Sequence, residues 1–79
     1  MASREEQAEI NLRRALRDAG VVFALVGVRR ETDGYVAVFR WGPGQHVESG
    51  IDEAVLEDAP PTEAMTRLIR KVESLLRPA

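Results

Sequence analysis

Apolar residues are most concentrated between Val21 and Trp41, and their arrangement predicts a β-hairpin. The first arm, Val21–Val28, has no polar side chain and is rich in β-branched residues, which favours a strand. It is also far shorter than the roughly 20 residues that a helix needs to cross a bilayer. The second arm, Tyr35–Trp41, follows Asp33-Gly34, a strong turn signal because glycine accepts a positive φ.

Two registers of this hairpin are open. A two-residue Asp33-Gly34 loop pairs Val28 with Phe39, whereas a Thr32-Asp33-Gly34 loop with a bulge offsets the arms by one residue. We prefer the first register because it gives one continuous apolar face and one mixed face. The apolar face then comprises Val22, Ala24, Val26, Val28, Ala37, Phe39 and Trp41. The mixed face comprises Phe23, Leu25, Gly27, Arg29, Glu31, Val36, Val38 and Arg40.

The mixed face carries more apolar residues than a solvated sheet surface normally does. An antiparallel sheet with one solvated face alternates between apolar and polar residues, and each exposed Val, Leu or Phe forgoes about 1.5–3 kcal/mol of burial. We therefore expect a second copy of the chain to cover this face in a homodimer. The alternative is that sheet twist and the chain's own segments cover it. The predicted self-association residues are Phe23, Leu25, Val36 and Val38.

Two amphipathic helices are predicted to flank the strands. Ser3 and Glu6 have the spacing of a capping box and Gly20 is a typical helix stop, so a helix is expected from Ser3 to Ala19. An apolar stripe with a period of 3.6 residues predicts a second helix over Thr62–Arg77. The proline that follows this stripe is expected to end the helix.

The segment between the hairpin and the last helix is polar and acidic. Gly42-Pro43-Gly44 predicts a type II turn, and Gln45–Ile51 predicts a third strand whose charged outer side suits a sheet edge. Asp52–Ala59 is expected to form a short helical turn. The chain is therefore predicted to be a single α+β domain over residues 1–79. Its α-β-β-β-α order gives a two-layer sandwich, with both helices on one face of a three-stranded antiparallel meander sheet.

Composition narrows the compartment and the chemistry. The 79 residues include no cysteine, which excludes disulfides, thiolate metal sites and thiol nucleophiles. The charged start of the chain lacks the apolar core of a signal peptide, so the cytoplasm is expected. A chain of this length forms one small core rather than a core and a deep catalytic cleft. We accordingly expect no enzymatic activity and no cofactor.

His46 is the only histidine and the first candidate for metal or catalytic chemistry, beside the acid pairs Asp52-Glu53 and Glu57-Asp58, for which no apolar surroundings are evident. Alternate residues of a strand share a face, so Glu48 and then Asp52 would lie on its side. Three such groups without a second histidine are a weak ligand set. Ser49, which a hydrolytic triad would need, faces the other way. A solvated strand edge is the favoured interpretation, and we predict neither a metal site nor catalytic residues.

The net charge of −2 is distributed unevenly along the chain. Gly42–Glu63 holds six acidic and no basic residues, which predicts contact with a basic partner protein, unless the segment only keeps the domain soluble. In size and charge the chain resembles small phage-type inhibitors, which implies an adaptor or inhibitor role. The leading prediction is thus a small non-enzymatic protein-interaction module. The predicted partner-binding residues are Glu48, Asp52, Glu53, Glu57 and Asp58.

The order of helix, three strands and helix resembles that of the double-stranded-RNA-binding domain across most of the chain, without a shared motif. In that family the last helix begins with a basic cluster, whereas here Asp58–Glu63 stands in its place and its acids would repel phosphate. Nucleic-acid binding is therefore the alternative function. It would use the basic residues on the backs of the two helices, namely Arg13, Arg14, Arg17, Arg67, Arg70 and Lys71.

Overall fold

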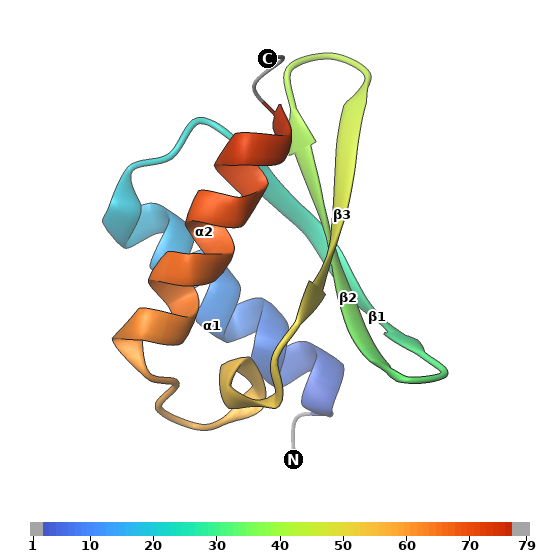
Figure 1. Cartoon of the computed structure of the whole chain (residues 1–79), viewed down its shortest axis with the longest axis vertical. Helices are drawn as coiled ribbons and strands as arrows, with labels where there is room; N and C mark the ends of the chain where they lie inside the picture. The colour runs from blue at the N-terminus through green and yellow to red at the C-terminus, as the bar shows by residue number, and fades with distance from the viewer. Residues whose placement is uncertain (1–2, 77–79) are drawn as a thin grey trace.

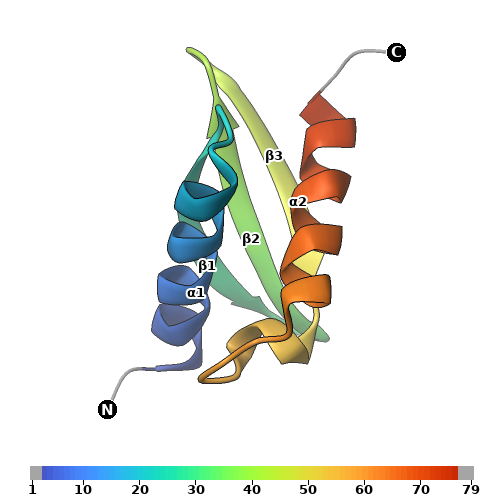
Figure 2. The same ribbon diagram turned by 90° about the vertical axis from the view of Figure 1, so that its left-hand side faces the viewer.

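The computed structural model describes residues 3–76, which form one layer of helices packed on one sheet. The elements are α1 (Arg4–Ala19), β1 (Ala24–Glu31), β2 (Gly34–Trp41), β3 (Gln45–Ile51), the 3₁₀ turn η1 (Glu53–Leu56) and α2 (Thr62–Leu76). The sheet is antiparallel with the order β1-β2-β3, and both helices lie on one of its faces (Figures 1 and 2). The predicted α+β fold is confirmed. The predicted helix end at Arg77 lies outside the described residues.

Local signals at both ends set the length of α1. The Ser3 hydroxyl accepts a hydrogen bond from the Glu6 N–H at 3.1 Å, which satisfies one of the unpaired donors of the first turn. Gly20 adopts the left-handed conformation with φ 64°, and its N–H donates to the carbonyls of Leu16 and Arg17 at 3.1 and 3.2 Å. A residue with a Cβ atom would be strained at this position, so glycine ends the helix as predicted.

The core lies between the sheet and the helices. Its most completely buried large side chains are Phe39 of β2, Leu12 of α1, Val55 of η1 and Val72 of α2, so every layer contributes. The ring of Phe23, just before β1, meets the ring of Phe39 edge to face, with centroids 5.6 Å apart. Aromatic rings favour this geometry because the positive edge of one faces the negative face of the other.

The hairpin loop consists of Thr32 and Asp33, so Glu31 pairs with Gly34. Gly34 has φ 151°, a conformation that other residues rarely adopt. The preferred Asp33-Gly34 loop is therefore wrong. Val28 pairs with Ala37 rather than with Phe39, so the pairing of the two strands is shifted by two residues. A shift of two leaves each side chain near the turn on its predicted face, because side chains alternate with a period of two.

A bulge at Val26 reverses the predicted faces of the first half of β1. The pairing with β2 shifts between Leu25 and Gly27, and one extra residue turns the preceding side chains to the opposite face. Phe23 is consequently only 5% exposed and Leu25 packs against the core. Val22 is 81% exposed and Val26 52% exposed. The prediction that Phe23 and Leu25 lie on the outer face, with Val22 and Val26 inside, is wrong.

Truncation of the two neighbouring residues should show which of them faces the core. Phe23→Ala is expected to lower the free energy of unfolding by about 3–5 kcal/mol, because it opens a cavity beside Phe39. Val22→Ala is the matched control and is expected to change that free energy by less than about 0.5 kcal/mol, since its side chain is exposed. Urea denaturation followed by circular dichroism measures both. The reverse ranking would restore the faces predicted from the hydrophobic pattern.

Candidate functional site

The sheet face away from the helices holds the two remaining predicted self-association residues, Val36 and Val38, which are half-buried. Arg29 lies opposite Val36, and Glu48 lies opposite Val38 on the other side of β2. The Arg29 guanidinium donates to Glu48 through Nη2–Oε1 at 2.5 Å and Nη1–Oε2 at 3.3 Å, so this ion pair spans β2 at the two valines. Of the other two predicted residues, Phe23 is buried in the core and Leu25 is half-buried against it. Self-association through this face stays a prediction, with less apolar surface to support it.

The same ion pair changes the electrostatics of Glu48. Hydrogen bonds from Arg29 hold the pKa of the Glu48 carboxyl below its ordinary value, and they raise the pKa of Arg29 above its own. Arg29 also donates from Nε to Glu31 at 3.2 Å. The charge of Glu48 is therefore engaged within the sheet, which makes it the least suitable of the predicted partner-binding acids.

The other four of these acids lie on the connection between β3 and α2, and all of them are exposed: Asp52, Glu53, Glu57 and Asp58. Asn11 of α1 holds this connection in place. Its Nδ2 donates to the backbone carbonyls of Val55 and Glu57, both at 2.7 Å, and the Asn11 side chain is buried. The structure thus groups four of the five predicted acids on one anchored loop.

The six basic residues of the alternative function, Arg17 among them, are all exposed. Arg13 donates to a glutamate one turn earlier in α1 at 3.0 Å. Arg14 borders a hollow between the two helices. Arg67 and Arg70 border a shallow hollow on α2 alone, and Lys71 borders a third beside the hairpin loop. Nucleic-acid binding through these residues stays a prediction.

His46 is exposed and lies opposite Arg40 on the sheet. Within residues 3–76, no group of three His, Cys, Asp or Glu side chains is placed to hold a metal ion. Every buried side-chain nitrogen or oxygen in this range has a hydrogen-bond partner. Neither of the described helices has the length and apolar character required to cross a membrane.

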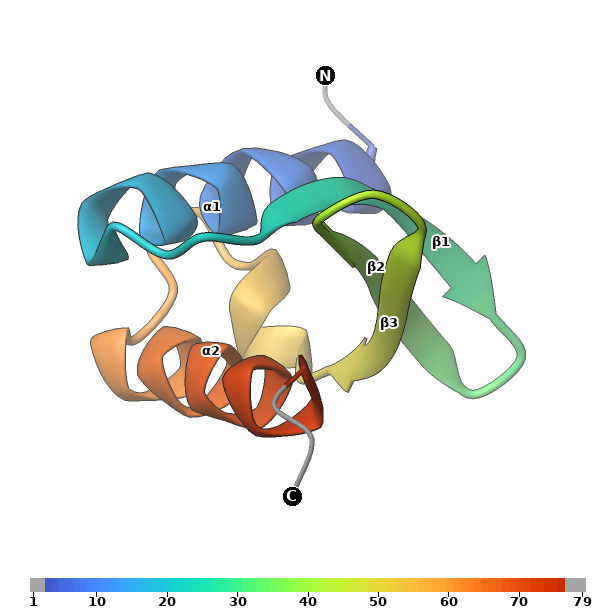
Figure 3. The ribbon, with the colours of Figure 1, turned by 90° about the horizontal axis from the view of Figure 1, so that it is seen from above.

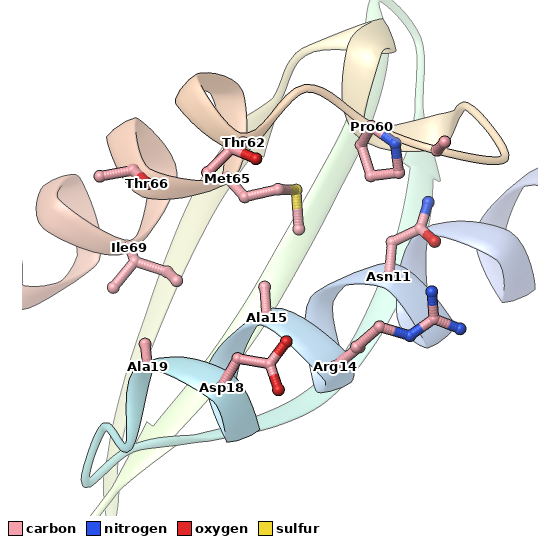
Figure 4. A pocket seen from close by; sticks show the side chains of 11 residues that line it. Asn11, Arg14, Ala15, Asp18, Ala19, Pro60, Thr62, Met65, Thr66 and Ile69 are labelled. Carbon is pink, nitrogen blue, oxygen red and sulfur yellow. The ribbon is translucent and has the colours of Figure 1, made fainter.

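A surface that the sequence analysis did not predict lies between α1 and α2. It is a hollow of about 500 Å³, bordered by both helices and by the loop that leads into α2. Figure 4 shows Met65 of α2 pointing across it toward Ala15 of α1, with Ile69 and Ala19 further along. No strand residue borders this hollow, so it opens on the side of the helices away from the sheet.

A second hollow of about 480 Å³ shares one border residue, Ala19, with the first. It lies where the C-terminal ends of the two helices approach the start of β1 and the end of β2, the end nearest the viewer in Figure 3. Val22, 81% exposed, and Trp41, 38% exposed, stand at its border beside Leu76. We call the two hollows together the interhelical trough, defined by Ala15, Ala19, Val22, Trp41, Met65 and Ile69.

Comparison with protein-family models, with curated proteins and with solved structures finds no match for this chain. The resemblance to the double-stranded-RNA-binding domain therefore remains one of element order. Function has to be inferred from the surfaces that the fold creates.

The pKa of Glu48 should be visible in the pH dependence of stability. Because its folded-state pKa is lowered, Glu48 stabilises the fold above its unfolded pKa, and this contribution is lost as the pH falls through the folded value. When the pH is lowered from about 6 to about 3, the free energy of unfolding of the wild type is expected to fall more than that of Glu48→Gln. Urea denaturation at each pH measures this free energy. NMR titration reports the Glu48 carboxyl directly. A Glu48 that titrates at its ordinary pKa would contradict the ion pair.

Proposed function

We propose that this chain is a small non-enzymatic protein-binding module of the cytoplasm, and that it binds another protein through the interhelical trough. One observation carries this proposal. Two hollows of about 500 and 480 Å³ share Ala19 at their borders, and Val22 and Trp41 remain exposed beside the second. Covering exposed apolar groups is favourable at about 25 cal/mol per Å², and tryptophan often supplies a large share of the binding energy in an interface.

The distribution of polar residues in the trough supports binding to a protein. Alanine, methionine and isoleucine lie toward its centre, and Arg14, Asp18, Thr62 and Thr66 stand around the first hollow. An apolar centre within a polar border is the usual composition of protein interfaces. No histidine borders either hollow.

The loop between β3 and α2 that carries Asp52, Glu53, Glu57 and Asp58, here called the acidic loop, supports the predicted preference for a basic partner. Ala59 and Pro60 border the first hollow and directly follow Glu57 and Asp58. A protein seated in the trough would therefore lie next to these exposed carboxylates, which attract positive charge and increase the rate of encounter. In this proposal the acidic loop assists a contact whose apolar part is the trough.

The proposal is tested by capture from an extract of the native host with variants of the trough. Ala19→Arg places a large charged side chain in both hollows. It should preserve the fold, because Ala19 is exposed and a cation is favourable at a helix C-terminus. Ser74→Arg is the matched control, since it adds the same charge to an exposed position of α2 that borders neither hollow. A bound protein should be retained about tenfold less by Ala19→Arg than by the wild type or Ser74→Arg.

Two results would contradict the proposal. Equal retention of every bound protein by all three forms would show that the trough is not the contact surface. Retention of the chain on duplex DNA or RNA, weakening steeply as salt rises, would support the alternative nucleic-acid function instead. Circular dichroism of each variant confirms that it is folded.

A further inference from the structure

Charge is distributed unequally along the trough. Only three charged residues border it within the described range, and they are placed unequally. Arg14 lies one turn before Asp18 on α1, further from the second hollow, whereas Glu73 borders the second hollow itself. Two of the three charges are negative, and both are on the side toward Trp41. A partner that fits would place positive charge there.

The helix dipoles act in the same direction. The C-terminal ends of α1 and α2 border the second hollow, through Ala19 and Gly20 and through Glu73 and Leu76. The N-terminal end of α2, at Thr62, borders the first hollow. Helix C-termini carry partial negative charge and helix N-termini partial positive charge. A helix lying in the trough is therefore favoured when its own N-terminus points toward Trp41.

The dimensions of the trough suit a helical partner. The α2 residues that border it run from Thr62 to Leu76, a rise of about 21 Å at 1.5 Å per residue. A partner helix of about four turns covers this length. Ala15 and Ala19, one turn apart on α1, leave room for a neighbouring helix to approach closely. An apolar stripe on such a helix would contact Met65, Ile69 and Trp41.

We propose that the trough binds an amphipathic, basic α-helix of about four turns from a partner protein, with its N-terminus at the Trp41 end and its cations beside Asp18 and Glu73. This inference rests on the proposed function and specifies the partner's chemistry. An acidic helix, an extended segment or a second copy of this chain as the occupant would contradict it.

The single tryptophan of the chain provides a direct readout. The probe is a 16-residue synthetic peptide of about four turns, lacking tryptophan, with a leucine stripe and lysines flanking it in its N-terminal half. Binding should shift the fluorescence of Trp41. A matched peptide with glutamate in place of each lysine should bind about tenfold more weakly, since two exposed ion pairs are lost and repulsion replaces them. A peptide of scrambled order should not bind measurably.

Orientation and location are tested separately. A nitroxide on the peptide's N-terminus should quench Trp41 more strongly than one on its C-terminus. Glu73→Gln should weaken the lysine peptide a few-fold and the glutamate peptide little. Ala19→Arg should weaken binding about tenfold, whereas Ser74→Arg should leave it within about twofold. Equal affinity for both charged peptides, or stronger quenching from the C-terminus, would overturn the inference.

The outcomes distinguish this inference from the proposed function. If no helical peptide binds, but Ala19→Arg still fails to retain a host protein that the wild type retains, then the trough binds proteins and the proposal of a basic helical partner is wrong. If the Trp41 fluorescence of the chain alone changes with concentration, and Ala19→Arg abolishes the change, the occupant is a second copy, which also overturns the inference. If neither peptides nor host proteins depend on the trough, both proposals fail.

Discussion

The contact between Phe23 and Phe39 holds the first strand under the helices, and the bulge at Val26 makes it possible. With regular pairing through this part of β1, Phe23 would point away from the core. The extra residue instead turns Phe23 inward and leaves Val22, its neighbour, 81% exposed. One local irregularity thus completes the core and at the same time creates the most exposed apolar side chain near Trp41. The stability of the sheet and the shape of the second hollow have the same origin.

The buried Asn11 side chain fixes the opposite end of the trough. Its two hydrogen bonds, to Val55 and Glu57, join α1 to the loop that leads into α2. Leaving a buried amide without its hydrogen-bond partners costs about 1–3 kcal/mol of folding free energy. This loop therefore has little freedom to move away from α1. Pro60 is held beside α1 as a result, and the first hollow is bounded by anchored segments. A preformed surface of this kind binds without a large cost of ordering.

Signals confined to a few neighbouring residues were sufficient to predict the elements. The Ser3 cap, the Gly20 stop and the apolar stripe of α2 each act over one or two helical turns, and the structure confirms all three. The bulge was not predictable in this way. Val21–Val28 is apolar at both odd and even positions, so its pattern does not state which face is buried. That choice depends on what packs against Phe39, which is a property of the whole fold.

The trough escaped prediction for a related reason. Ala15 and Ala19 belong to the apolar face of α1, and an amphipathic pattern does not distinguish alanines covered by the sheet from alanines beside a gap between two helices. The signal in the sequence that could have indicated the trough is a pair of small residues, Ala15 and Ala19, one turn apart on α1 and close to Val22.

The outer sheet face and the interhelical trough differ in how far polar side chains of the chain itself cover their apolar residues. On the outer sheet face, Arg29 and Glu48 form a bidentate ion pair across β2 at the half-buried Val36 and Val38, so polar side chains already occupy that surface. In the trough, the alanines Ala15 and Ala19 leave space between the helices, and the charged residues stand at its border. A partner over the sheet would have to displace or desolvate an ion pair, which is costly. A partner in the trough would cover apolar atoms and meet its charges at the edge, and for that reason we place the proposed contact on the helical side of the molecule.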